Sequence, residues 1–419
     1  MKKVLIISYY WPPAGGSGVQ RWLKFSKYLP NFGWEPIVYT PENPYSEIKD
    51  LDLLKDIDEA VEVWKTPIWE PYALKDKFFG RGKKNQSAGV ISNNIVLNWL
   101  RGNIFIPDPK IYWVKPSVKY LVERIRSEGI KHIITTGPPH SMHLIGLGLK
   151  KNIPNLKWIA DFRDPWTRLD LLDEFYLSKL SMRKHQRLEK EVLETADITL
   201  TVSEGWVSSF KSLGSKNVEL ITNGFDDNDF NVKEPVPEKF IIGHFGLINH
   251  LRNPKNLWKT LDDLCDQNSK FDKKLEIRLS GNIDSDVLDN IKKHLHLKDK
   301  VKVLGYLSHK EVLEQYNNSS VLLLLLFNSE SGKGNYPGKI FEYFAAKRPI
   351  LAFGPRYSDA ERLIQETETG VFFTYDNTEL KKEILSLFNN RKTLPSSTHI
   401  EVFNRKKLTK DLSELLNSI

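Results

Sequence analysis

The chain has 419 residues, of which 40% are hydrophobic and 27% are charged. This length predicts two or three domains, and the composition is typical of a soluble globular protein with a substantial core. The single cysteine, Cys265, excludes an intramolecular disulfide and favours a reducing compartment. The net charge of +8 indicates acidic partners such as phosphorylated molecules or anionic lipids. No nucleic-acid-binding motif accompanies the charge, so we expect no nucleic acid partner.

The longest apolar run, residues 321–327, is too short to cross a bilayer. The N-terminal run Val4 to Ile7 leads directly into a segment rich in Gly and Pro. We interpret it as a buried first strand rather than a signal sequence, and we expect a cytoplasmic protein.

Short apolar runs alternate with longer amphipathic stretches along the first half of the chain, which predicts strand–helix–strand units and a parallel sheet. The predicted strands are residues 4–8, 36–39, 132–135, 158–160, 198–202 and 218–221. Predicted helices between them include residues 20–29, 118–126 and 180–194.

Residues 72–120 interrupt this alternation. They are basic and interleaved with aromatic residues, for example Lys75, Phe78, Trp99 and Tyr112. We interpret them as an insertion in the first domain. It is either a solvated loop that packs a few aromatics or a contact for an acceptor or an anionic membrane surface.

A second series of strands follows the Pro-containing stretch at 234–237, at residues 240–245, 275–280, 301–304, 321–326, 350–353 and 371–373. Two such series predict two Rossmann-like, doubly wound domains at residues 1–233 and 234–400. Parallel sheets bind ligands beyond the carboxyl ends of their strands, so two sheets that face each other would form a cleft. The remaining residues, 401–419, contain an amphipathic helix at 405–417 that can dock back on the first domain.

Three loops of the first domain follow predicted strands. Gly15 to Gly18 lies between the first strand and the first helix, where glycines permit close backbone approach to an anion or simply form a tight turn. The spacing of these glycines is not GxGxxG, so it does not indicate a dinucleotide-binding site. His140, in the loop at 136–143, is either an ordinary polar surface residue or a hydrogen-bond partner for a sugar. Asp161, Arg163 and Asp164 form either an internal salt-bridge network or a substrate-recognition site. His140 and His143 have no third ligand at a metal-binding spacing, so we expect no metal.

The second domain has two candidate loops. Arg252 and Lys255 follow the first strand of this domain at a predicted helix start, which suits a diphosphate or is ordinary solvated charge. The Gly-rich loop 332–338 leads into a helix with Lys339 and, one turn later, Glu342. The remaining candidates for donor binding are the strand-end residues Gly246, Gly281 and Tyr306 and the loop residue Gly338.

The order of these motifs resembles the retaining glycosyltransferases of the GT-B fold, in particular family 4 and its relatives. The resemblance covers nearly the whole chain, and no single motif is decisive. It rests on the segments 15–18, 161–166, 196–203, 221–226, 243–254 and 339–346.

The resemblance implies that the C-terminal domain binds a nucleotide sugar, such as a UDP- or GDP-sugar. Glu342 would hold the ribose, Arg252 or Lys255 would neutralise the leaving diphosphate, and Gly16 would approach the phosphates from the first domain. It also implies transfer with retention to a hydroxyl acceptor, without an obligatory metal or other cofactor. The implied role is synthesis of a cell-surface polysaccharide or glycolipid, with a lipid-linked acceptor at the inner membrane face.

Two departures from the family pattern leave alternatives open. Gly334 stands where the family has its first glutamate, with Glu330 the nearest carboxylate, and Arg163 or Asp164 stands where it often has a histidine. A non-catalytic protein that binds sugar nucleotides would fit the missing glutamate. A non-hydrolysing 2-epimerase would use the same fold.

Overall fold

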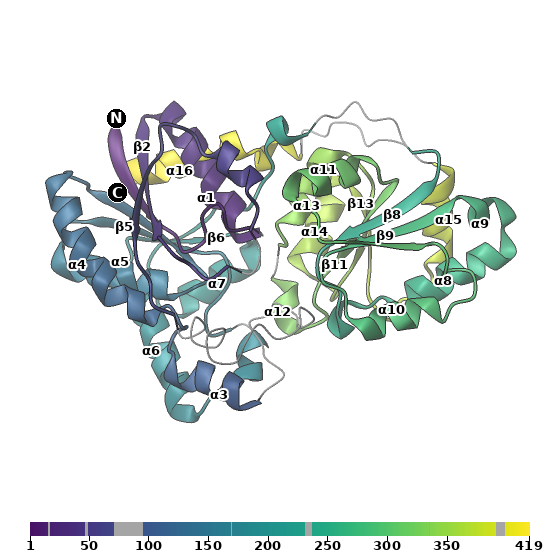
Figure 1. Ribbon diagram of the computed structural model, residues 1–419, viewed down its shortest axis with the longest axis horizontal. Coiled ribbons are helices and arrows are strands. Elements are labelled where there is room, and N and C mark those ends of the chain that lie inside the picture. The colour runs from purple at the N-terminus through teal and green to yellow at the C-terminus, as the bar shows by residue number, and fades with distance from the viewer. Residues whose placement is uncertain are drawn as a thin grey trace. The chain divides into compact units, whose positions relative to one another are not determined.

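The computed structural model describes residues 1–15, 17–46, 49–70, 95–168, 170–230, 237–334, 336–390 and 399–419. Gly16 and the first part of the predicted insertion therefore lie outside the described residues. The chain forms two compact units, one of residues 1–222 with 405–419 and one of residues 223–404 (Figure 1). The units thus divide at 222/223 and 404/405, where the sequence had predicted domain ends at 233 and 400.

The first unit contains a parallel sheet in the order β3-β2-β1-β4-β5-β6-β7. Its strands are β1 (Lys2–Ile7), β2 (Trp34–Pro41), β3 (Glu62–Thr66), β4 (His132–Gly137), β5 (Lys157–Phe162), β6 (Ile198–Thr201) and β7 (Val218–Leu220). Its helices are α1 (Ser17–Tyr28), α3 (Ile95–Ile104), α4 (Ile111–Ser127), α5 (Ser141–Asn152), α6 (Lys179–Thr195), α7 (Glu204–Ser212) and α16 (Arg405–Ser418), with short 3-10 turns η1 (Leu29–Phe32), η2 (Asp52–Asp56) and η3 (Asp170–Phe175).

Both faces of this sheet are buried. Along β1, Leu5 and Ile7 pack in one apolar core, whereas Val4 and Ile6 pack in the core on the opposite face. Successive side chains of a strand point to opposite faces, so an unbroken apolar run fits a sheet covered by helices on both sides. This explains why β1 could be recognised in the sequence.

The C-terminal helix α16 belongs to the first unit. Leu408, Leu412 and Leu416, spaced one helical turn apart, are buried in the same core as Trp22 and Phe25 of α1. Figure 1 shows α16 beside α1 and both chain ends in this unit. The chain therefore leaves the first unit, forms the second, and returns to complete the first.

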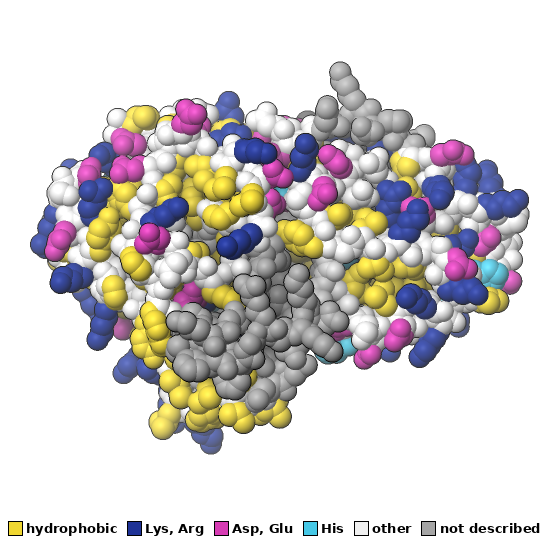
Figure 2. All heavy atoms as spheres, viewed as in Figure 1, with side chains coloured by type: hydrophobic (Ala, Val, Ile, Leu, Met, Phe, Trp, Pro, Cys, Tyr) yellow, Lys and Arg dark blue, Asp and Glu magenta, His cyan; other side chains and the backbone are white. Residues whose placement is uncertain are grey.

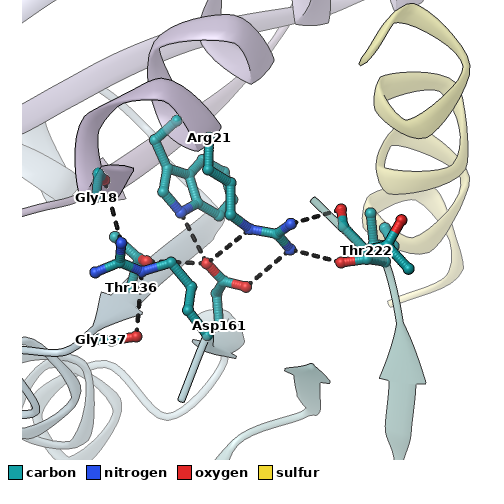
Figure 3. A network of polar contacts seen from close by, with 9 residues as sticks. Gly18, Arg21, Thr136, Gly137, Asp161 and Thr222 are labelled. Atoms are coloured by element: carbon teal, nitrogen blue, oxygen red, sulfur yellow. Dashed lines mark hydrogen bonds and ion pairs between the residues drawn. The ribbon is translucent and has the colours of Figure 1, made fainter. Parts of the chain in front are cut away.

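A buried ion pair lies beside the point where the chain leaves the first unit (Figure 3). Arg21 of α1 and Asp161 of β5 are almost fully buried and pair at 3.0 Å. Asp161 also accepts hydrogen bonds from Trp22 Nε1 at 2.8 Å and Thr136 Oγ1 at 2.9 Å. The Arg21 guanidinium donates to the carbonyl of Thr222 at 2.8 Å and to that of Ile221 at 2.9 Å. One ion pair thus joins α1, β4, β5 and the outgoing chain.

The second unit contains a parallel sheet in the order β10-β9-β8-β11-β12-β13. Its strands are β8 (Phe240–Phe245), β9 (Leu275–Ser280), β10 (Val301–Gly305), β11 (Val321–Leu325), β12 (Ile350–Phe353) and β13 (Gly370–Phe373). Its helices are α8 (Lys255–Gln267), α9 (Ser269–Lys274), α10 (Ser285–Lys292), α11 (His309–Asn317), α12 (Glu330–Lys333), α13 (Lys339–Ala346), α14 (Asp359–Thr367) and α15 (Lys381–Asn389), with 3-10 turns η4 (Asp227–Asp229), η5 (His250–Arg252) and η6 (Glu401–Phe403).

The two sheets share one strand order. Numbered within each unit, the strands run 3-2-1-4-5-6, with β7 added at one edge of the first sheet, and this is the order of doubly wound nucleotide-binding folds. In the second unit Leu323 and Leu325 of β11 face one core, while Leu322 and Leu324 face the other. The structure confirms the predicted class of two α/β units with parallel sheets.

We expect the Arg21–Asp161 pair to govern the stability of the first unit. Asp161→Asn leaves the Arg21 charge buried without its counter-ion, which costs about 3–5 kcal/mol in the free energy of unfolding. Ten of the 11 tryptophans lie in the first unit, so tryptophan emission during a urea titration reports its unfolding.

The matched control is Glu128→Gln, which breaks the partly exposed pair of Glu128 with Lys3 at 2.9 Å. Exposed ion pairs contribute little, so this variant should unfold close to the wild type. Equal urea midpoints for Asp161→Asn and the wild type would contradict the role given to the buried pair.

Candidate functional site

In the second unit the candidate residues gather where the strand order reverses. The chain continues from β8 to β9 on one side and from β11 to β12 on the other, so β8 and β11 flank the reversal. In doubly wound folds the ends of such diverging connections leave a crevice at the carboxyl ends of the two central strands. Residues that follow β8 and β11 are therefore placed for ligand binding.

Lys339 of α13 extends to the carboxyl end of β8. Its Nζ donates to the carbonyl of Phe245 at 2.9 Å. A Cβ atom added at Gly246 would lie 2.3 Å from this Nζ, and Gly246 has a φ of +153°, so glycine leaves the room that the ammonium occupies. Burial, and then the nearby Arg252 charge, lower the pKa of Lys339 to about 7, while Glu342 opposes the shift. Lys339 is thus a partly uncompensated cation.

Arg252, at the end of η5, supplies a second cation. Its guanidinium stacks on the ring of Phe327, which follows β11, at 3.6 Å from the ring centroid. Burial lowers its pKa to about 10, and its buried Nε has no hydrogen-bond partner among the described residues. Arg252 and Lys339 are both partly buried. Cations removed from water normally have an anionic or hydrogen-bonding partner, so together they form a site suited to an anion.

Glu342 lies one helical turn after Lys339 on α13. Its Oε2 accepts a hydrogen bond of 2.9 Å from the hydroxyl of Tyr316 on α11. Burial, with a contribution from Glu342, raises the pKa of Tyr316 well above its usual value, so this hydroxyl stays protonated and remains a donor. The carboxylate is held half-buried by one hydrogen bond and retains capacity to accept more.

The remaining donor-binding candidates lie nearby or at the surface. Gly281 has a φ of +103°, and a Cβ there would lie 2.6 Å from the Gly246 carbonyl oxygen, so close packing of the two loops already requires glycine. A Cβ at Gly338 would meet only Asn223 at 4.0 Å, so the start of α13 is open. Lys255 is an exposed first residue of α8, and Tyr306 is 57% exposed.

Two further residues bear on this site. Glu330, the nearest carboxylate to the position of the missing glutamate, is strongly exposed and pairs with Lys333 at 2.7 Å. His244 of β8 was not predicted as a site residue. Its Nδ1 lies 2.9 Å from the Leu323 carbonyl of β11, and burial, then Lys339, lower its pKa far below the usual value. A neutral histidine therefore links the two central strands. Its position two residues before Gly246 was the only feature of the sequence that could have marked it as a site residue.

In the first unit a guanidinium organises the loops at the corresponding strand ends. Arg163, just after β5, donates to the carbonyls of Gly137 at 3.3 Å and Gly18 at 3.2 Å (Figure 3). It also donates to the carbonyl of Pro138. A Cβ at Gly18 would lie 3.1 Å from the Arg163 Nη1. Arg163 and Gly18 thus connect the loops after β1 and β4. Both residues therefore have a structural role in addition to the ligand contact predicted for them.

Asp161, the last but one residue of β5, and Asp164, two residues after the strand, differ in their surroundings. Asp161 is fully buried, and its carboxylate is occupied by Arg21, Trp22 and Thr136. The geometry gives it an internal role and offers no support for a sugar contact. Asp164 is half-buried and has no hydrogen bond or ion pair to any other described residue. Burial raises the pKa of Asp164, and the Arg163 charge opposes this shift.

Two neutral histidines lie behind these loops. His140 is buried, with 9% of its surface exposed, and its ring stacks on that of Trp166 with centroids 5.0 Å apart. Its Nδ1 has no hydrogen-bond partner among the described residues. His143 Nδ1 lies 2.8 Å from Thr135 Oγ1. Burial, and then the Arg163 charge, lower the pKa of His143 to about 3, and burial also lowers that of His140. Nowhere in the described ranges do three His, Cys, Asp or Glu residues form a group that could hold a metal.

Comparisons with known proteins bear on the family and the fold. Residues 225–401 match the model of the family described as glycosyl transferases group 1. No curated protein matches the sequence. Among the helices that the structure describes, none is long and apolar enough to span a membrane.

Several solved structures share the fold over their whole length. A sucrose-phosphate synthase from Thermosynechococcus elongatus has a TM-score of 0.65 at 14% identity, covering 100% of this chain and 99% of that one. A glycosyltransferase from Rickettsia africae has a TM-score of 0.62 at 16% identity, covering 100% and 98%. WaaG, a glycosyltransferase involved in lipopolysaccharide biosynthesis, has a TM-score of 0.57 at 11% identity, covering 99% and 98%.

The family match falls on the unit that carries Lys339, Arg252 and Glu342, and the fold similarity extends over both units. The chain therefore has the GT-B fold and resembles the GT-B glycosyltransferases, with its second unit matching the glycosyl transferases group 1 family.

Proposed function

We propose that this protein is a retaining glycosyltransferase that moves a hexose from a nucleotide diphosphate sugar to a hydroxyl acceptor. The observation that carries the proposal is the pair of cations, Lys339 and Arg252, at the strand-order reversal of the second unit, with Glu342 one turn away. A nucleoside diphosphate carries a group for each part of this site: an anionic diphosphate for the two cations, and a ribose with two hydroxyls for the Glu342 carboxylate.

In this proposal Lys339 and Arg252 stabilise the charge that develops on the departing diphosphate, and Lys255 adds a more exposed cation. Preorganised cations at a developing anion are a main source of rate acceleration in transfer reactions. Transfer then needs no metal or other cofactor, and activity in the presence of a chelator tests this point. The open start of α13 at Gly338 leaves space for the diphosphate close to backbone N–H groups.

The first unit would bind the acceptor through Asp164, with Arg163, Gly18 and His140 shaping the loops around it. Asp164 is the carboxylate of this group without a protein partner among the described residues, so it is the one that can accept from an acceptor hydroxyl. We further propose a cytoplasmic enzyme of cell-surface polysaccharide or glycolipid synthesis that acts on a lipid-linked acceptor at the membrane surface.

The direct test is a calorimetric panel of UDP, GDP and their sugar conjugates. A single preferred nucleotide should bind, and its sugar conjugate should then serve as donor. Incubation with the conjugate alone separates transfer from epimerisation, since an epimer would form without any acceptor. Failure of every nucleotide to bind would overturn the proposal.

Glu342→Ala should weaken nucleotide binding by about 10- to 100-fold, because one or two hydrogen bonds to a charged acceptor are lost. Tyr316→Phe removes the hydroxyl that orients the carboxylate and should have a smaller effect in the same direction. The control is Glu314→Ala, an exposed glutamate on the same helix as Tyr316. Wild-type affinity in Glu342→Ala, measured by calorimetry, would remove Glu342 from the site.

Nucleotide binding should depend on pH through Lys339. The free protein has a Lys339 pKa of about 7, so above this pH the amine is largely neutral and must take up a proton when the diphosphate binds. Affinity should therefore fall as pH rises from 7 to 9, by up to about tenfold per pH unit.

Calorimetry at pH 8 in two buffers of different ionisation enthalpy measures this proton uptake. Lys339→Gln should abolish the uptake and weaken binding, whereas Lys298→Gln, an exposed lysine of the same unit, should change neither. Binding without proton uptake at pH 8 in the wild type would contradict the assignment.

Asp164→Asn should reduce transfer to the acceptor by about 10- to 100-fold while nucleotide affinity stays unchanged. The carboxyl has a raised pKa, so wild-type transfer should also decline on acidification at a higher pH than for an ordinary aspartate. Transfer of labelled sugar from the identified donor to membranes of the source organism measures both effects. Glu59→Gln, on the surface of the same unit, is the control. A loss of nucleotide affinity in Asp164→Asn would refute an acceptor-side role.

A further inference from the structure

Helix α3 exposes its apolar side chains, whereas an ordinary surface helix buries them. Its buried positions are Asn98 and Gly102, one turn apart. A Cβ at Gly102 would meet Phe175 and Leu177 at 2.6 and 2.5 Å, so this side is packed tightly against the segment that follows η3. The side chains with the largest exposed fractions are instead apolar: Ile95 at 61%, Val96 at 63%, Leu97 at 42%, Trp99 at 44% and Ile104 at 53%.

The neighbouring segments enlarge this apolar area. Asn103 of α3 donates to the carbonyl of Tyr176 at 3.3 Å and accepts from the backbone N–H of Ser178 at 2.8 Å, which fixes the segment before α6 beside α3. Tyr176 of that segment is 50% exposed, and Leu180, the second residue of α6, is 77% exposed. We call the exposed apolar residues of α3, together with Tyr176 and Leu180, the α3 surface.

Aromatic side chains continue the α3 surface on its other side. Phe105 follows α3 directly and contacts Tyr112, whose ring meets that of Trp69 edge-on at 5.0 Å. Both Trp69 and Tyr112 are about half exposed. In Figure 2 hydrophobic side chains gather at the lower edge of the molecule, where Figure 1 places α3, and Lys or Arg side chains adjoin them. An exposed apolar area of this extent is typical of a surface that binds a partner.

The charges next to the α3 surface are mainly positive. Lys179, Arg183 and Arg187 recur every four residues on α6 and form one exposed stripe that begins beside Leu180. None of the three has an ion pair in the part of the chain that the structure describes. Between residues 173 and 187 there are four cations, with Lys184, against the two carboxylates of Asp173 and Glu174.

We propose that the α3 surface inserts into the headgroup region of an anionic lipid bilayer. Trp and Tyr rings are preferred at membrane–water interfaces, and a row of Lys or Arg beside inserted apolar side chains binds anionic headgroups. A helix that carries its apolar side outward fits the mode of an interfacial helix, which lies in the bilayer plane without spanning it. The choice of lipid over protein as the occupant rests on these aromatic residues, the basic stripe and the net charge of +8.

The lipid contact rests on the proposed function in one respect only, because it would bring the enzyme to a lipid-linked acceptor. The experiment is flotation of the full-length protein with vesicles of phosphatidylcholine alone or mixed with phosphatidylglycerol, at about 0.1 M salt and without nucleotide sugar. The wild type should float with the anionic vesicles, whereas only a small fraction should float with the neutral vesicles.

Two sets of substitutions separate the apolar and the charged contributions. Val96→Gln combined with Trp99→Gln should lower the fraction bound to anionic vesicles at least tenfold. Lys179→Gln combined with Arg183→Gln and Arg187→Gln should lower it as well and should reduce the dependence of binding on salt. The matched control, Leu295→Gln with Tyr357→Gln, replaces two equally exposed apolar residues of the second unit and should float like the wild type.

Thermal unfolding and nucleotide affinity of every variant should equal those of the wild type, because all the changed side chains are exposed. The proposal is overturned if the wild type does not float with anionic vesicles, or if the Val96/Trp99 variant floats as well as the wild type. It is also overturned if sedimentation shows a wild-type dimer that this variant converts to a monomer, since a second copy would then cover the α3 surface. None of these measurements uses the donor. A failure of the lipid proposal can therefore be distinguished from a failure of the calorimetric test of nucleotide binding.

Discussion

The arrangement of the first unit depends on the buried ion pair between Arg21 and Asp161. Two opposite charges in an apolar interior must satisfy each other, and here they do so while also engaging Trp22, Thr136 and the carbonyls of Ile221 and Thr222. The Asp161 carboxylate near the end of β5 is thereby fixed, and so is the backbone from which Arg163 and Asp164 follow. The loop that carries Arg163 and Asp164 inherits its position from this pair.

The two units treat buried charge in opposite ways. In the first unit Arg21 and Asp161 neutralise each other, and nothing is left for a ligand to supply. In the second unit the Arg252 charge lies close enough to Lys339 to lower its pKa, and Glu342 is the carboxylate that opposes this shift. Such an arrangement costs free energy in the empty protein, which a bound anion would recover. The contrast separates the charges that hold the fold from those to which we assign ligand binding in our proposal.

Much of the fold could be predicted from the sequence because both sheets are buried on both faces, which leaves uninterrupted apolar runs. Strand β3 was missed because it lies at a sheet edge, where Trp64 is its one buried side chain, so no apolar run marks it. Asp161 and Asp164 lie three residues apart and look equivalent in the sequence. Only their three-dimensional partners distinguish an internal carboxylate from an available one. Likewise, helix α3 falls within the stretch 72–120 that was interpreted as an insertion, and the sequence did not show that Gly102 would face inward and Trp99 outward.

The return of the chain to its first unit has a consequence for synthesis. Phe225 donates its backbone N–H to the carbonyl of Phe403 at 3.1 Å, so the outgoing and returning segments run side by side. The entire second unit is inserted between β7 and α16 of the first. On the ribosome, Trp22 and Phe25 of α1 therefore lack the apolar cover of Leu408, Leu412 and Leu416 until nearly the whole polypeptide has emerged. The second unit can fold as soon as it is made, whereas the first unit, although translated earlier, finishes last. Nascent chains that stall within the second unit would expose this apolar side of α1 to chaperones and proteases.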